Sequence, residues 1–206
     1  MNTETTETLV ESETGMNGRL CLFSLYVDFA AAVRARWVTS QIAKLAGEHW
    51  KASSEMWNLD SVAASEPIRK LIAQEEAAAD VLVIAMSSME RRELELVQWL
   101  DSLAGGKTTR TAAGLFIGLL GDESNRTGEL DWTVKQFLRC AQQTDRDFIW
   151  RWMEPEAMVA GDWLADSVES LLTRKQPAHD AAFLQETVIG EAQNSNSHCR
   201  FIRSSI

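Results

Sequence analysis

The sequence predicts an α/β protein: a three-layer, doubly wound parallel sheet of five strands in the order 2-1-3-4-5, with helices on both faces. Short apolar segments alternate with amphipathic helical segments along the chain, which is the pattern of repeated strand–helix–strand crossovers. Five such units are too few for a closed eight-stranded barrel. The first, third and fourth apolar segments are the strongest, and we therefore expect them in the middle of the sheet.

The predicted strands are short and rich in apolar and β-branched residues. Residues 20–27 (LCLFSLYV), 81–86 (VLVIAM) and 112–120 are almost continuously apolar, which is typical of strands buried on both faces. Residues 55–59 (EMWNL) and 147–153 (DFIWRWM) carry more polar side chains. These two segments are expected to form the edges of the sheet.

The predicted helices begin and end at local signals. Pro67 lies in the first turn of the second helix, where a missing N–H costs no hydrogen bond. Gly47 follows the first helix, and Gly105 and Gly106 follow the third, where glycine commonly ends a helix. The five helices are expected at residues 29–47, 66–79, 90–104, 129–144 and 158–172.

The composition is that of one globular domain with flexible ends. The chain has 206 residues, 45% hydrophobic and 24% charged, enough for one core. The acidic residues 1–18 and the polar residues 175–206 show no sustained apolar periodicity, and we expect disordered tails there. The domain is therefore expected at residues 19–174.

Charge and cysteine content exclude several classes of protein. The net charge of -10 repels a phosphate backbone, so no nucleic-acid partner is expected. The longest apolar run, residues 112–120, is shorter than the roughly 20 residues of a membrane helix, so no membrane partner is expected. The three cysteines Cys21, Cys140 and Cys199 are widely spaced, which fits neither a disulfide framework nor a zinc site and indicates a cytoplasmic protein.

The pattern of residues 19–174 resembles the receiver domains of response regulators, which share this topology. A receiver carries an acidic pair after its first strand, a phospho-accepting Asp after the third and a Lys after the fifth. In this chain the third strand is followed by Ser87 and Ser88, and the fifth by Glu154. The resemblance therefore implies the receiver fold without phosphorelay chemistry.

The same pattern resembles the flavodoxins, which hold their flavin phosphate in a hydroxyl- and glycine-rich turn after the first strand. Backbone N–H groups and a helix N-terminus approach the anion there. The corresponding turn, residues 28–32, reads DFAAA, and its aspartate would repel a phosphate. No cofactor is therefore expected, and FMN is kept as the alternative. The segments YVDF (26–29) and WNLD (57–60) also resemble an uncharacterised bacterial family, which implies no known activity.

Polar side chains at the predicted strand exits are candidate ligand contacts, because ligands bind at the carboxyl ends of the strands in such sheets. Asp28 and Asp60 follow neighbouring strands and could form a cation or acid–base site, or each could cap the next helix. Ser87 and Ser88 could contact an anion, but no histidine is placed to act as their base. The candidate ligand-binding residues are Asp28, Trp57, Asp60, Ser87, Ser88 and Asp122, with no catalytic residue and no metal ligand assigned.

Tryptophan is abundant, with eight tryptophans against one tyrosine. Trp150 and Trp152 share one side of the fifth strand because side chains alternate along a strand. Large aromatic side chains at a sheet edge suit contact with a protein, and these two are the predicted interface. Core packing accounts for the tryptophans on predicted helices, Trp37, Trp99, Trp132 and Trp163.

These observations favour a receiver-like module that lacks phosphorelay residues and acts in regulation by protein–protein contact. Its partner would be a second copy of the chain or another protein. The alternative is an oxidoreductase that binds a small molecule or a flavin in the crevice at the strand exits. A metal-assisted hydrolase using Asp28 and Asp60 is a third hypothesis, weakened because two acids without histidine make a poor ligand set.

Overall fold

The sheet has the predicted strand order. The computed structural model describes residues 18–87, 93–105, 114–121, 128–152 and 162–175. All adjacent strands are parallel, in the order β2-β1-β3-β4-β5. The strands are β1 (Gly18–Tyr26), β2 (Trp50–Asn58), β3 (Val81–Ala85), β4 (Gly114–Leu120) and β5 (Arg146–Trp152).

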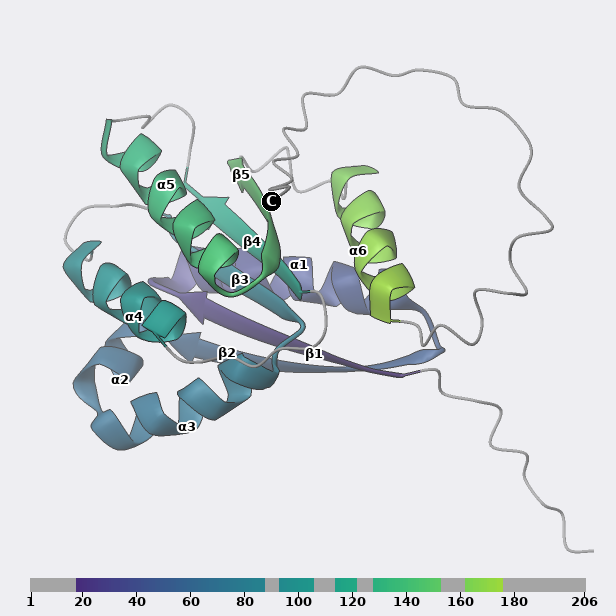
Figure 1. Ribbon diagram of the computed structural model, residues 1–206, viewed down its shortest axis with the longest axis horizontal. Coiled ribbons are helices and arrows are strands. Elements are labelled where there is room, and N and C mark those ends of the chain that lie inside the picture. The colour runs from purple at the N-terminus through teal and green to yellow at the C-terminus, as the bar shows by residue number, and fades with distance from the viewer. Residues whose placement is uncertain (1–17, 88–92, 106–113, 122–127, 153–161, 176–206) are drawn as a thin grey trace, which may run out of the picture.

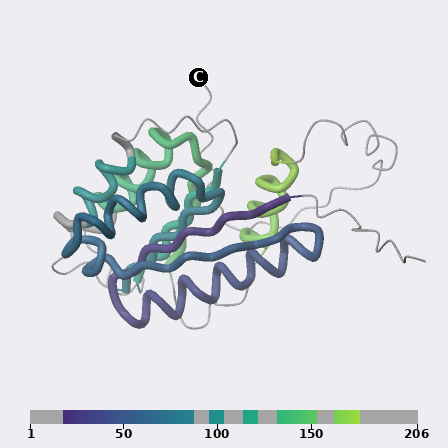
Figure 2. The backbone as a smooth tube through the Cα atoms, turned by 90° about the horizontal axis from the view of Figure 1, so that it is seen from below, coloured from purple at the N-terminus to yellow at the C-terminus, as the bar shows by residue number. Residues whose placement is uncertain are grey.

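Helices cover both faces of this sheet, which confirms the three predicted layers (Figure 1). Figure 2 shows α1 on one side of the sheet and α3 to α5 on the other. Helix α6 packs beside α1, and α2 packs beside α3 and α4. The helices are α1 (Phe29–Ala46), α2 (Leu59–Ala64), α3 (Glu66–Ala78), α4 (Glu93–Gly105), α5 (Gly128–Gln143) and α6 (Asp162–Lys175).

The burial of each strand explains its place in the sheet. Every residue of β3 and β4 is buried, because helices cover both faces of these central strands. Most residues of β2 and β5 are exposed or half-buried. The polar side chains of the two weaker segments therefore lie at the edges, as predicted.

Two elements differ from the prediction. Strand β2 begins at Trp50, earlier than the apolar pattern indicates, and pairs with β1 over its whole length. After the buried Trp50, residues 51–54 (KASS) have little apolar character because an edge strand needs little. The short helix α2 was not predicted, since six residues are too few for a clear helical period.

The last turn of α6 is attached to the sheet by a mostly buried ion pair. The Lys175 ammonium lies 2.6 Å from the Asp80 carboxylate and donates to the Arg19 carbonyl at 3.0 Å. The Asp80 carboxylate also accepts a hydrogen bond from the Cys21 N–H at 2.8 Å. Lys175 lies one residue beyond the predicted domain boundary, yet it connects α6 to β1 and to the start of β3.

Candidate functional site

Asp28 and Ser87 meet where β1 and β3 end. The two strands pair in parallel as far as Tyr26 and Ala85, so the residues that follow them are neighbours. One Asp28 oxygen accepts the Ala31 N–H at 2.9 Å and caps α1. The other accepts the Ser87 N–H at 3.4 Å and the Ser87 hydroxyl. The carboxylate therefore joins two strand exits and the start of a helix.

These hydrogen bonds determine the charge of Asp28. Partial burial opposes ionisation, but hydrogen bonds from the Ser87 hydroxyl and from the backbone of Ala31, Ser87 and Ala30 outweigh it and hold the pKa below its usual value. The side chain is therefore an ionised acceptor at neutral pH, and described donors already surround it.

The phosphate of FMN does not fit this arrangement. In this fold such a phosphate would need the free N–H groups at the start of α1. Here Asp28 accepts the Ala31 N–H and places a negative charge at the same point. An incoming phosphate would displace that carboxylate or be repelled by it.

The remaining candidates at the strand exits do not join this pair through any contact found among the described residues. Asp60 is exposed in the first turn of α2, and its N–H donates to the Asn58 side chain at 2.9 Å, so Asn58 caps that helix. The Trp57 indole N–H donates to Glu75 of α3 at 3.1 Å, on the opposite side of the sheet from α1. Ser88 and Asp122 lie outside the described residues.

Asp28 thus acts as a helix cap, one of the two roles the sequence left open, whereas Asp60 does not. Within the described ranges, no group of three or more His, Cys, Asp and Glu residues is placed to hold a metal ion. None of the described helices is long and apolar enough to cross a membrane.

Gly121 supports the same strand exits and was not predicted. A Cβ atom placed on Gly121 would lie 2.2 Å from the Ser87 carbonyl oxygen, well inside van der Waals contact. The end of β4 can therefore approach Ser87 only with glycine at this position. Its place directly after an apolar strand was the available signal.

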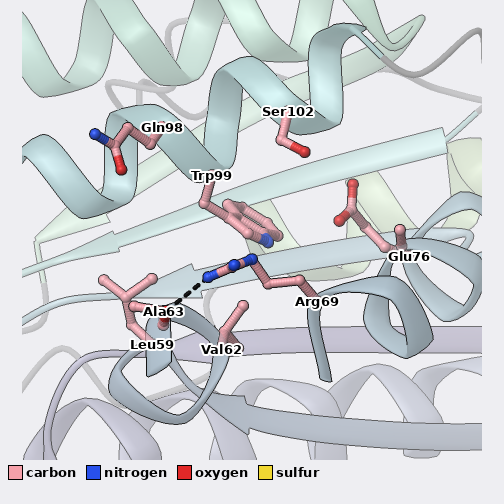
Figure 3. Close-up of a pocket in the computed structure, with 9 residues that line it drawn as sticks. Leu59, Val62, Ala63, Arg69, Glu76, Gln98, Trp99 and Ser102 are labelled. Carbon is pink, nitrogen blue, oxygen red and sulfur yellow. Dashed lines mark hydrogen bonds between the residues drawn. The ribbon is translucent and has the colours of Figure 1, made fainter. Parts of the chain in front are cut away.

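A second candidate site lies between helices, away from the strand exits. A partly open cavity of about 360 Å³ is lined by residues of α2, α3 and α4 (Figure 3). Its volume is at the small end of the range typical of ligand pockets. The lining residues are Leu59, Val62, Ala63, Arg69, Ala73, Glu76, Gln98, Trp99 and Ser102.

Glu76 is the buried acid of this cavity. It is only 7% exposed, and no hydrogen bond or ion pair to its carboxyl group is found among the described residues. Burial raises the pKa of Glu76 to about 8, although the charge of Arg146 opposes this shift. The sequence offered one unused signal: Glu76 lies four residues after the buried Ile72, on the helix face that points inward.

The charge of Arg146, from β5, acts on Glu76, and the charge of Glu76 acts on Cys140, from α5. The Arg146 guanidinium donates to the backbone carbonyls of Glu76 and Ala79, at 3.1 and 3.3 Å. Burial, and next the charge of Glu76, raise the pKa of the Cys140 thiol to about 12, so this cysteine stays protonated. Cys140 is therefore the inert buried residue that its sequence pattern indicates.

The predicted interface tryptophans lie together on the edge strand β5. The Trp150 and Trp152 rings are perpendicular, with centroids 5.4 Å apart, and both side chains are half-buried. Arg151 points to the other face, where its guanidinium lies 5.4 Å from the centre of the Trp163 ring. Trp132 of α5 is 38% exposed, so the prediction that it packs in the core is wrong.

Comparison with known proteins finds likeness to solved structures alone. No protein-family model matches the chain, and no curated protein matches it. Two flavodoxins are among the solved structures that resemble it at fold level. A short-chain flavodoxin associated with a non-canonical PDU bacterial microcompartment is 16% identical with a TM-score of 0.48, covering 75% of this chain and 97% of its own.

The second is a flavodoxin, WrbA-like protein from Agrobacterium tumefaciens, 12% identical with a TM-score of 0.46, covering 77% of this chain and 99% of its own. The strand order and the helices on both faces define a flavodoxin-like fold. Since one fold hosts many functions, function has to be argued from the residues of this chain.

Proposed function

We propose that this protein is a non-catalytic module that acts by protein–protein contact, and that β5 is its contact surface. The observation that carries the proposal is the pair of half-buried tryptophans on an edge strand. Tryptophan is among the residues that contribute most binding free energy at interfaces. An edge strand also presents backbone groups that can pair with another chain.

The strand exits support a non-catalytic role. The Asp28 carboxylate already accepts hydrogen bonds from Ala31 and Ser87, so it is held as a structural group. The Ser87 hydroxyl donates to that carboxylate. A serine nucleophile needs a base that takes its proton during attack, and an ionised carboxylate of lowered pKa is a weak base.

A second copy of the chain is the partner we propose for β5. In a two-fold symmetric contact the same strand meets itself, so Trp150 of one protomer can pack beside Trp152 of the other. Sedimentation equilibrium of the full chain should show a dimer. The Trp150→Ala/Trp152→Ala double variant should sediment as a monomer.

Trp132→Ala is the matched control, because Trp132 is an exposed tryptophan on α5, outside the edge strand. This variant should stay dimeric. Circular dichroism of each variant distinguishes lost contact from lost folding. A wild-type monomer at micromolar concentrations, or a folded double variant that remains dimeric, would contradict the proposal.

A further inference from the structure

The cavity between α2, α3 and α4 contains a feature that packing does not explain. Glu76 is more than nine-tenths buried, and its carboxyl group faces the cavity with no hydrogen bond found among the described residues (Figure 3). A buried carboxyl without a partner destabilises a fold, so proteins rarely keep one without a role. Such groups are concentrated at binding and catalytic sites.

The walls of the cavity suit an apolar body attached to a positive charge. The Trp99 side chain and the apolar Leu59 and Val62 form its buried part. Trp99 is held parallel to Phe23, with ring centroids 6.4 Å apart. An indole ring attracts cations electrostatically, and it also covers the apolar surface of a ligand.

We propose that this cavity binds a small organic cation, a protonated amine with an apolar body, whose ammonium group pairs with the Glu76 carboxylate. The net charge of -10 draws cations toward the protein. Once ionised, the Glu76 carboxylate would repel an anion. Arg69, on the exposed side of the cavity, already donates to the Ala63 carbonyl at 2.6 Å.

Binding should be coupled to loss of a proton from Glu76. The pKa of Glu76 is about 8 in the free protein, so the carboxyl group is mostly protonated at pH 7. An ammonium ion pairs with the ionised form, and the displaced proton passes to the buffer. Affinity should therefore rise with pH until Glu76 is ionised in the free protein.

The described groups coupled electrostatically to Glu76, Arg146 and Cys140, keep their charge in this range. Arg146, from β5, keeps its positive charge. The thiol of Cys140, from α5, has a pKa of about 12. Asp101, from α4, is exposed, and its charge is felt at Cys140. The pH dependence of binding can thus be assigned to Glu76.

The test is calorimetric titration of the full chain with phenethylamine at millimolar concentrations, at pH 6 and at pH 9. A primary alkyl amine stays largely protonated below about pH 10, as a lysine side chain does. If only the ionised form of Glu76 binds, affinity should increase by about tenfold to a hundredfold between these pH values. Titrations at pH 7 in two buffers of different ionisation enthalpy should show release of nearly one proton.

Two protein variants and one neutral ligand test whether binding needs the Glu76 carboxylate and the charge of the amine. Glu76→Gln should lose the pH dependence and bind at least about tenfold more weakly at pH 9. Glu66→Gln should behave as wild type, because Glu66 lies on the same helix but is exposed and paired with Lys70. The neutral analogue 2-phenylethanol should bind at least about tenfold more weakly than the amine.

Several results would overturn the proposal: no binding of phenethylamine, equal binding of the alcohol, or unchanged binding by Glu76→Gln. Since glutamine has the size of glutamate, this variant should fold. Its thermal unfolding, measured alongside, confirms that any lost affinity belongs to the carboxylate.

Discussion

Asp28 and Glu76 are two acids of one domain in opposite situations. Asp28 lies at the strand exits and accepts hydrogen bonds from Ala31 and Ser87, which lower its pKa. Glu76 lies between helices, where burial raises its pKa to about 8. Asp28, at the edge of the sheet where this fold commonly binds ligands, therefore has its hydrogen bonds within the protein. Glu76 lies elsewhere, and no hydrogen bond to its carboxyl group is found among the described residues, so position in the fold alone does not indicate where a ligand is needed.

The largest expected effect on the free energy of unfolding concerns Asp80 and Lys175, a mostly buried pair. Unlike Glu76, Asp80 has an ionic partner. Asp80→Ala should lower the free energy of unfolding by about 3 kcal/mol, because it leaves a mostly buried ammonium without its carboxylate. Urea unfolding at pH 7 measures the loss. The control is Asp147→Ala, whose carboxylate meets Arg174 at a more exposed position. That change should cost less than about 1 kcal/mol, and equal losses would contradict the prediction.

Glu76→Gln should instead raise the free energy of unfolding. Between pH 4.5 and about 8 the folded protein holds a proton on Glu76 that the unfolded chain has released. Wild-type stability therefore falls as pH rises through this window, and the glutamine variant lacks this loss. Urea unfolding should show the variant to be more stable than wild type by roughly 1 to 3 kcal/mol at pH 8.5, and by much less at pH 5.

Glu66→Gln serves again as the control, because its exposed carboxylate should give a small difference that does not change across this pH range. A difference between Glu76→Gln and wild type that stays constant from pH 5 to 8.5 would show that Glu76 is ionised at ordinary pH. The contrast with Asp28 would then disappear.

The smallest effect is expected at Asp28. Asp28→Ala removes the cap of α1 and the acceptor for Ser87, and should cost about 1 to 2 kcal/mol. Asp28→Asn keeps an oxygen that can accept the Ala31 N–H, so its cost should be smaller. Both are measured by urea unfolding at pH 7. If alanine and asparagine have equal effects, the cap is not what Asp28 contributes.

The fold could be predicted because apolar strands and helix-ending residues are local features of the sequence that recur along the chain. The strong apolar runs of β1, β3 and β4 predicted the middle of the sheet, and the more polar segments of β2 and β5 predicted its edges. Gly47 marked the end of α1 correctly, with a φ of 70° that glycine adopts without strain. The sequence predicted the last part of β2 but not its polar beginning. That beginning is held as a strand by pairing with β1, which an apolar pattern does not reveal.

The candidate sites were harder to predict, since they depend on which side chains meet in space. The sequence placed Asp28 and Ser87 at neighbouring strand exits, and the structure brings them together. It grouped Trp57 with them, whereas that side chain turns to Glu75. The sequence analysis did not single out Glu76, because its cavity depends on residues of α2 and α4 that are distant from it in the sequence.

The contact between Lys175 and the first strand also bears on synthesis of the chain. Lys175 reaches the carbonyl of Arg19, 156 positions earlier in the sequence. A ribosome releases the chain from its N-terminus, so β1 leaves the ribosome long before the residue that fastens α6 to it. Until then β1, β2 and α1 of the nascent chain lack the helix α6 that packs beside α1. Such long-range closure slows folding and lengthens the period in which apolar surface needs protection from aggregation.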